Sequence, residues 1–150
     1  MKMRAWVLLA LALGVSEARG AARVVESPRV QEDGGDSVVV AEGIHAIFSD
    51  IELGLAQGNP AMFSDHLASQ LYVSIPGEQG AYYSSSQAFY LLEEFLQRTR
   101  LPEFRFATME DGPGTPFASG AVSGTRGRAQ VYVSLSRAGQ RWVISKISIY

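Results

Sequence analysis

The sequence predicts an α+β fold in which three N-terminal helices pack on one face of a curved antiparallel sheet. Apolar residues recur at helical spacing between residues 41 and 98, which predicts the helical layer. After Pro102 the chain alternates β-like segments with glycine-containing turns, which predicts a four-strand meander. A short hairpin before the third helix completes the expected sheet.

The composition is that of one small globular domain. The chain has 150 residues, of which 47 % are hydrophobic and 19 % are charged, so it is too apolar to remain disordered. It contains no cysteine, which excludes disulfides, thiolate nucleophiles and cysteine-ligated metal centres. We therefore expect packing alone to stabilise the fold.

The first 20 residues have the features of a secretory signal peptide. A basic start at residues 1–4 precedes an apolar run at 5–15, and Ala18-Arg19-Gly20 places small residues at the spacing that a signal peptidase recognises. The apolar run is too short to cross a bilayer, which takes about 20 residues. Residues 21–41 are predicted to be a flexible leader and residues 42–150 the domain. We expect an exported protein, periplasmic or extracellular, that is soluble after cleavage and has no transmembrane segment.

Two helices are predicted at the start of the domain. Gly58 ends the first of them, and Asn59 and Pro60 then cap and start a short second helix. Phe63 and Leu67 give this second helix its inward face. The inward stripe of the first helix comprises Ile44, Ile47, Phe48, Ile51 and Leu55, and Glu42, Asp50 and Glu52 are predicted to lie outside it.

A hairpin and a third helix follow. Residues 71–75 and 81–83 are β-like and flank the turn residues 76–80. Ser84 and Gln87 match a capping box, in which each side chain accepts a hydrogen bond from the other residue's free backbone N–H. The buried stripe of the helix comprises Ala88, Leu91, Leu92, Phe95 and Leu96, and Glu94 is placed to pair with Arg98.

Four strands are predicted after the third helix. The turns between them are short, so consecutive strands must be antiparallel. In the third of these strands Val131, Val133 and Leu135 alternate with less apolar residues, which predicts one buried and one half-polar face. The four strands are expected at residues 104–109, 117–123, 128–137 and 141–150.

Charge is unevenly distributed along the chain. Residues 1–20 carry three basic residues against one acid, so their removal changes the net charge from −2 to −4. Residues 97–150 carry eight basic residues against three acids, whereas residues 21–96 carry two against eleven. Either the predicted sheet attracts anions, or the two halves fold together and their charges interleave, which we favour. A net acidic chain is a poor nucleic-acid binder, so no nucleic-acid partner is expected.

No motif indicates a metal, a cofactor or covalent catalysis. The two histidines, His45 and His66, are 21 residues apart and have no ligand pattern around them, so structural or surface roles are expected. The serine run at Ser84 is explained by helix capping, and the glycine-rich stretches lack the phosphate-loop and dinucleotide spacings. We therefore predict no metal site and no cofactor.

Positions spread over residues 43–150 match a known family pattern. They are Phe48 with Ile51 and Leu55 leading to Gly58-Asn59, Val73-Ser74-Ile75, Tyr83-Ser84 followed by Gln87-Ala88, Phe95, Gly120, and Val131-Tyr132. On these residues the chain resembles the nuclear transport factor 2-like superfamily and, within it, bacterial secreted proteins grouped as domain of unknown function 4783. The resemblance implies a cone-shaped domain with a pocket between helices and sheet, often dimeric in the superfamily, and no established reaction. The family's histidine and glycine are replaced here by Thr108 and Glu110, and a second phenylalanine by Leu96, so no site is inferred there.

The resemblance also suggests where a catalytic base would lie. Some members of the superfamily isomerise or cyclise apolar substrates with a carboxylate that stands just before a proline at the end of the first strand. Here Ser74 and Ile75 precede Pro76, and neither accepts a proton at neutral pH. Asp65 is the nearest carboxylate, but its position indicates a turn or cap. We expect a non-enzymatic protein, with an isomerase, cyclase or hydratase using Asp65 as the alternative.

Two kinds of binding remain as hypotheses. A small apolar or amphipathic ligand could occupy the cone, lined by Met62, Tyr72, Phe106 and Val133, unless these residues simply fill the core. Together with such a pocket or in its place, we expect the outer face of the sheet to form a homodimer or to dock another envelope protein. Alternation predicts that this face carries Tyr132, Trp142, Lys146 and Tyr150.

Overall fold

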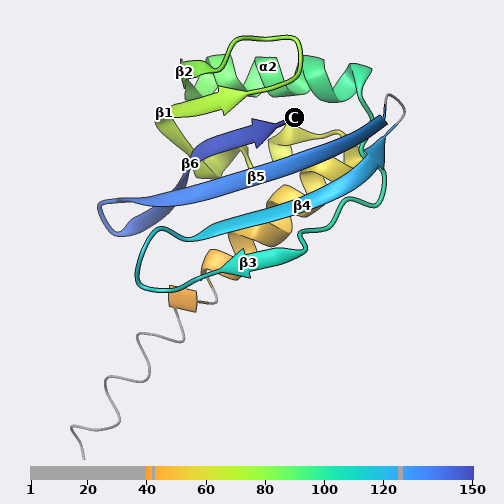
Figure 1. Ribbon diagram of the computed structural model, residues 1–150. Helices are drawn as coiled ribbons and strands as arrows, with labels where there is room; N and C mark the ends of the chain where they lie inside the picture. The colour runs from red at the N-terminus through yellow and green to blue at the C-terminus, as the bar shows by residue number, and fades with distance from the viewer. Residues whose placement is uncertain (1–39, 42, 125–126) are drawn as a thin grey trace, which may run out of the picture. The chain divides into compact units, whose positions relative to one another are not determined.

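The computed structural model describes residues 40, 41, 43–124 and 127–150 of the chain (Figure 1). The predicted signal peptide lies outside these residues, as does the predicted leader except for its last two residues, 40 and 41, which are helical. No helix of the described segments is long and apolar enough to cross a bilayer. The described residues therefore belong almost entirely to the predicted domain.

The first helix, at residues 43–57, buries its predicted apolar stripe. Gly58 ends it with a φ of +70°, a left-handed conformation that glycine adopts without steric cost. Gly54 faces the next segment so closely that a methyl group there would lie 2.6 Å from the ring of Phe63. Glu52, which was predicted to lie outside the stripe, is also buried. The five stripe residues Ile44, Ile47, Phe48, Ile51 and Leu55 are all buried.

The predicted second helix is replaced by two single 3₁₀ turns. They are η2 (Pro60–Met62) and η3 (Ser64–His66). Asn59 caps the first turn as predicted, since its side chain accepts a hydrogen bond from the backbone N–H of Ala61 at 3.2 Å. Phe63 and Leu67 are buried, so the inward face was predicted correctly although the α-helix was not.

The hairpin and the following helix agree with the prediction. β1 (Leu67–Ser74) pairs with β2 (Ala81–Ser84), and α2 (Ser85–Arg98) begins directly after β2. The capping box is present: the Ser84 hydroxyl accepts from the Gln87 backbone N–H at 3.3 Å, and the Gln87 side chain accepts from the Ser84 N–H at 3.1 Å. Glu94 and Arg98 form the predicted pair at 2.6 Å.

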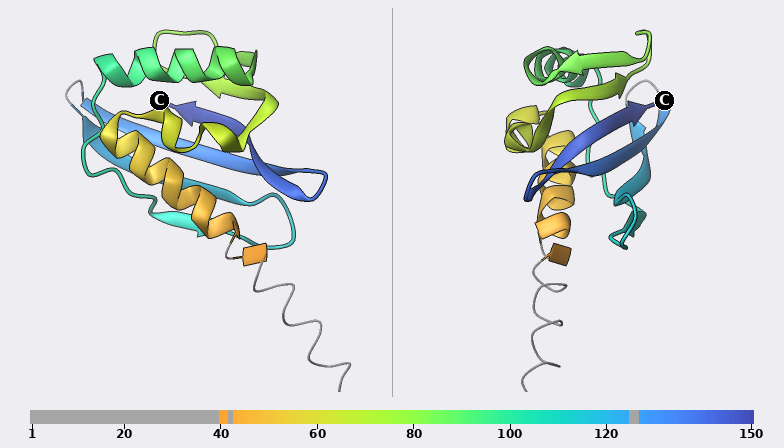
Figure 2. Two further views of the ribbon diagram at one scale, coloured as in Figure 1. Left: turned by 180° about the vertical axis from the view of Figure 1, so that it is seen from behind. Right: turned by 90° about the vertical axis from the view of Figure 1, so that its left-hand side faces the viewer.

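The sheet has six strands in the order β2-β1-β6-β5-β4-β3. The antiparallel meander is confirmed, but the sheet is mixed, because β1 runs parallel to β6. Short turns fix the direction of neighbours in sequence only, and these two strands are joined by most of the domain. Figure 2 shows the helices on one side of the sheet. The remaining strands are β3 (Thr108–Glu110), β4 (Phe117–Gly124), β5 (Gly127–Ala138) and β6 (Arg141–Ile149).

β3 is shorter than the strand predicted at residues 104–109. The preceding residues 104–106 are not in a strand but cross over β4 at Gly120. A side chain at Gly120 would collide with the backbone of Arg105 and Phe106, so glycine is required for this approach. Phe106 of this segment packs on the first helix, with its ring centroid 5.7 Å from that of Phe48, and Phe104 packs on Phe106 at 5.1 Å.

The two faces of the sheet differ as the alternation predicted. Because cross-strand partners share a face, the register assigns each side chain to one side. The buried face packs against the helices, whereas Tyr132, its cross-strand partner Ser148 and Lys146 lie on the opposite face, which we call the outer face. The centre of the buried face consists of Val131, Val133, Leu135, Ile144, Ile147 and Ile149.

Candidate functional site

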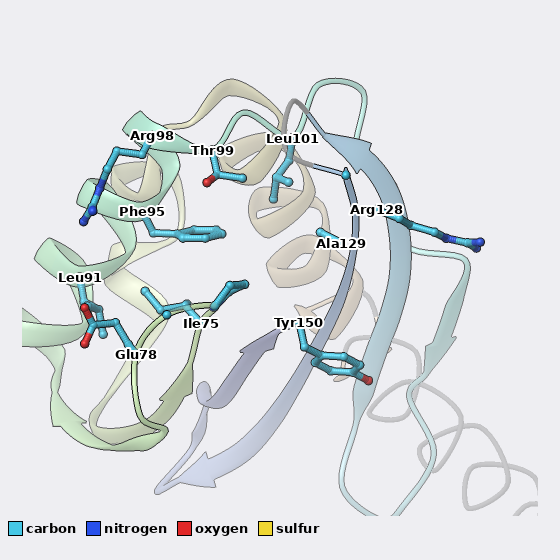
Figure 3. Close-up of a pocket in the computed structure, with 13 residues that line it drawn as sticks. Ile75, Glu78, Leu91, Phe95, Arg98, Thr99, Leu101, Arg128, Ala129 and Tyr150 are labelled. Atoms are coloured by element: carbon cyan, nitrogen blue, oxygen red, sulfur yellow. The ribbon is translucent and has the colours of Figure 1, made fainter.

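A pocket of about 480 Å³ lies between α2, the turn after β1 and the beginning of β5 (Figure 3). Its volume falls within the range of small-molecule sites, which is roughly 300–1,000 Å³. The elements that form it are far apart in sequence. Four separate parts of the chain therefore have to be folded before the pocket exists, since Tyr150 also lines it.

The pocket has an apolar interior. Phe95 projects from α2, Ile75 from the end of β1, and Leu101 from the segment after α2, and all three side chains are almost completely buried. In Figure 3 the side chains of Phe95, Leu101 and Ala129 point toward the same hollow. Leu91 adds to this lining from α2. Such a surface favours an apolar ligand because its burial removes hydrocarbon from water.

Charged groups lie at the rim of the pocket. Arg98 and Arg128 extend away from the hollow in Figure 3, and Glu78 lies on the turn after β1. Arg98 is held by Glu94, since its Nη2 lies 2.6 Å from the Glu94 Oε1. Among the described residues that line the pocket, Glu78 is the one carboxylate, and it is exposed.

The four ligand-binding residues predicted from the sequence do not line this pocket. Val133 is fully buried on the face that carries Ile147, whereas Tyr72 pairs with Lys146 on the outer face. Phe106 packs on Phe48 and Phe104, with ring centroids at 5.7 and 5.1 Å. Met62 lies in η2. The structure therefore divides these residues between the core, the outer face and a 3₁₀ turn.

The predicted outer-face set is brought together only in part. Tyr132 and Lys146 are neighbours, with the Lys146 Nζ 5.6 Å from the ring centroid of Tyr132. Tyr150 pairs with Gln130 at the end of the sheet and contributes to the pocket lining. The outer-face prediction was wrong for Trp142. This residue pairs with Arg137 and, by register, shares the face of Leu135 and Ile144 rather than that of Lys146.

A register shift explains the position of Trp142. Ser134 pairs with Lys146, but the next residue, Leu135, pairs with Ile144, so Ser145 is an extra residue in β6. One extra residue reverses the alternation of side chains beyond it. The guanidinium of Arg137 lies 4.8 Å from the ring centroid of Trp142.

Glu52 makes a hydrogen bond and an ion pair that were not predicted from the sequence. Its Oε1 accepts a hydrogen bond from the backbone N–H of Phe106 at 2.6 Å, and its Oε2 lies 3.5 Å from Arg105 Nη1. The side chain of Glu52 is 12 % exposed and that of Arg105 is 82 % exposed. The contact joins the first helix to the segment that crosses β4. The sequence around Glu52 does not predict this hydrogen bond, because the donor is a backbone N–H 54 residues away.

The two histidines and Asp65 each contact another residue of the fold. His45 pairs with Asp111 at 3.1 Å and His66 with Asp50 at 3.3 Å. No group of three or more metal-ligating side chains occurs within residues 43–124 and 127–150. Asp65 is exposed on η3, and its backbone oxygen accepts a hydrogen bond from Arg141 at 3.0 Å. It is not among the described residues that line the pocket.

The pattern of residues seen in the fold corresponds to a defined family. The profile named "Domain of unknown function (DUF4783)" matches residues 48–150, which is more than half of the chain. The chain belongs to the DUF4783 family. The matched range contains every element that forms the pocket. No curated protein matches the sequence.

Solved structures give the same fold assignment. A DUF4783 protein from Bacteroides uniformis matches with a TM-score of 0.62 and 15 % identity, over 67 % of this chain and 93 % of that protein. An NTF2-like protein from Anabaena variabilis matches with a TM-score of 0.54 and 18 % identity, over 76 % of this chain and 87 % of that one. At these identities the similarity establishes the NTF2-like fold of this DUF4783 protein and nothing about its chemistry.

A third structural neighbour carries an enzyme name. It is a Streptomyces avermitilis protein of the NTF2-like family, provisionally named a dehydratase, with a TM-score of 0.54 and 8 % identity over 73 % of this chain and 93 % of that one. The described pocket of the DUF4783 chain has an apolar interior and a carboxylate only at its rim. The name of this neighbour is therefore a reason to test catalysis and not evidence for it.

Proposed function

We propose that this protein is a non-catalytic binding module that holds a small apolar molecule in the pocket between α2 and β5. The observation that carries the proposal is the hollow of about 480 Å³, whose interior is lined by the buried apolar side chains of Ile75, Phe95 and Leu101. A filled core would leave no space of this size, because protein interiors are close-packed. We propose further that the module acts after export, on the strength of the sequence of residues 1–20.

The test is ligand binding before and after the hollow is filled. Purified protein is titrated with N-phenyl-1-naphthylamine, a neutral apolar dye whose fluorescence rises in apolar surroundings. Ala129→Phe places a ring in the hollow, because the Ala129 side chain points into it (Figure 3). Ala121→Phe is the matched control, since Ala121 is exposed and pairs with Gln130 on the outer face.

The expected result is saturable dye binding that Ala129→Phe weakens by about tenfold or more and Ala121→Phe leaves unchanged, since each 1.4 kcal/mol changes affinity tenfold. Native mass spectrometry of the protein from its source is expected to show a copurifying lipid-like molecule. Equal dye binding by both variants, or none by the wild type, would reject the pocket as the binding site.

Catalysis is the alternative function. Within the described pocket the candidate general base is Glu78 and not Asp65, which was the candidate from the sequence. Glu78 lines the pocket, whereas Asp65 lies on η3. Ketosteroid and hydratase substrates should therefore be incubated with the wild type, Glu78→Gln and Asp65→Asn. A binding module gives no turnover with any of them. Turnover that is lost in Glu78→Gln and retained in Asp65→Asn would replace our proposal by a general-base enzyme.

A further inference from the structure

Five side chains form a continuous row across the outer face of the sheet, one from each of the strands β2, β1, β6, β5 and β4. The ring centroids of Tyr82 and Tyr72 are 5.5 Å apart, and those of Tyr132 and Phe117 are 5.6 Å apart. Lys146 lies between the two pairs, with its Nζ 5.5 Å from the centroid of Tyr72 and 5.6 Å from that of Tyr132. We call these five residues the aromatic–lysine row.

The row is accessible to a partner. Tyr82 is 74 % exposed and Lys146 is exposed, while Tyr72, Tyr132 and Phe117 are partly exposed. The helices pack on the other face of the sheet, so the hydrophobic core does not account for these aromatic side chains. Clustered aromatic residues of this kind are typical of protein interfaces rather than of ordinary surface.

The charged side chains on the outer face are basic over most of its width. Lys146 and Arg128 lie on it, and no salt bridge of either residue is found within the described segments. By register, the strands β1, β2, β4, β5 and β6 place no carboxylate on this face. Glu110, on the short edge strand β3, is the one acid that the described strands place on this face. The face is therefore basic although the chain as a whole is acidic.

We infer that the aromatic–lysine row is a docking surface for an acidic peptide segment of a partner protein, one that alternates carboxylates with aromatic side chains. The rings of Tyr72 and Tyr132 hold the Lys146 ammonium group at the surface, where a carboxylate of the partner can reach it. The exposed rings offer rigid, amphipathic contact area, and the neighbouring serine and tyrosine hydroxyls can hydrogen-bond to a peptide. This surface is separate from the pocket, so the inference does not depend on the proposed function.

A second copy of the chain fits this surface less well. Lys146 is the middle member of the row, so a two-fold face-to-face pairing centred on the row would bring two Lys146 side chains together. Like charges that meet in a buried interface are strongly unfavourable. An acidic segment instead supplies the charge that the face lacks.

The test uses a fluorescently labelled random copolymer of glutamate and tyrosine, and fluorescence anisotropy reports its binding. Polylysine, polyglutamate and polygalacturonate are the comparison polymers, the last being an anionic glycan without peptide or aromatic groups. The protein variants are Lys146→Glu, Lys146→Met and Lys146→Arg. Arg100→Glu is the matched control, because it makes the same charge change at an exposed residue after α2.

We expect the glutamate–tyrosine copolymer to bind more tightly than polyglutamate and polylysine not to bind. Lys146→Glu and Lys146→Met should weaken copolymer binding by about tenfold or more, while Lys146→Arg and Arg100→Glu retain it. Binding should also decrease with salt, because exposed charges are screened. The Met variant keeps the aliphatic stem of Lys146, and thermal melting checks that each variant is folded.

Four outcomes would overturn the inference. The first two are that the folded wild type does not bind the copolymer, or that Arg100→Glu loses as much copolymer binding as Lys146→Glu. The third is Lys146-dependent binding of polygalacturonate that is tighter than binding of the copolymer, and the fourth is a dimer that Lys146→Glu dissociates in sedimentation velocity. The third outcome would identify a glycan-binding face, and the fourth a homodimer interface. Either would exclude the acidic peptide as the occupant of the row.

Discussion

Removing the buried carboxylate of Glu52 should destabilise the domain more than removing any exposed charge. Its Oε1 accepts the Phe106 backbone N–H at 2.6 Å in a nearly dry position. A hydrogen bond to a charged group contributes about 1.5–3 kcal/mol, and a buried N–H left without a partner costs about 1–3 kcal/mol. We therefore expect Glu52→Ala to lower the free energy of unfolding by about 2–3 kcal/mol and the melting temperature by about 10 °C.

Two further variants separate the hydrogen bond from the charge. Glu52→Gln keeps an acceptor oxygen and should lower the free energy of unfolding by about 1 kcal/mol. Arg105→Ala removes a guanidinium that is 82 % exposed, so a change within about 1 kcal/mol is expected. Urea unfolding followed by circular dichroism measures all three.

The reference for an exposed carboxylate is Glu94→Ala. It removes the surface pair with Arg98, a helix pair at i and i+4 that is worth about 0.3–0.5 kcal/mol. If Glu52→Ala is no more destabilising than Glu94→Ala, the contact between the first helix and Phe106 does not stabilise the fold and our reasoning is refuted.

Two other predictions concern local packing and capping, and thermal or urea unfolding checks both. Gly54→Ala should lower the free energy of unfolding by about 1–3 kcal/mol, because the added methyl group would overlap the ring of Phe63. Gly43→Ala adds the same group to the same helix, but nothing lies within 4 Å of it, so a gain of up to about 1 kcal/mol is expected. Ser84→Ala should cost about 1 kcal/mol, because its hydroxyl accepts the backbone N–H three residues on at the start of α2. Ser86→Ala removes a hydroxyl inside the same helix and should be close to neutral; equal effects within either pair would contradict these assignments.

Features set by neighbouring residues were predicted well from the sequence. The stripe of the first helix, the cap at Asn59 and the capping box of Ser84 and Gln87 all depend on residues within one or two helical turns. The alternation of Val131 and Val133 likewise follows from the two-residue period of a strand. Such patterns can be predicted because the residues that cause them are close together in the sequence.

Features that join distant segments were not predictable in the same way. Whether Glu52 faces solvent or a backbone N–H depends on where residues 104–106 pass, and nothing in the first helix encodes that path. The extra residue at Ser145 has no composition signal, yet it moves Trp142 to the other face. The outer-face prediction therefore holds only on the near side of this bulge, for Tyr132, Lys146 and Tyr150, the last of which pairs with Gln130.

The location of the pocket follows from the one strand pairing that the sequence did not predict. Because β1 runs parallel to β6, Ser74 lies beside Ser148, which in turn lies beside Tyr132 of β5. This register carries the turn after β1 to the end of the sheet where β5 begins, and α2 passes above that end. If β1 ran antiparallel to β6, the turn after β1 would lie at the opposite end of the sheet, away from the start of β5. Val133, which was predicted to line a ligand pocket, lies instead in close-packed core. A ligand is therefore to be sought at the end of the sheet, and Ala129→Phe, not a substitution of Val133, is the change that separates binding from folding.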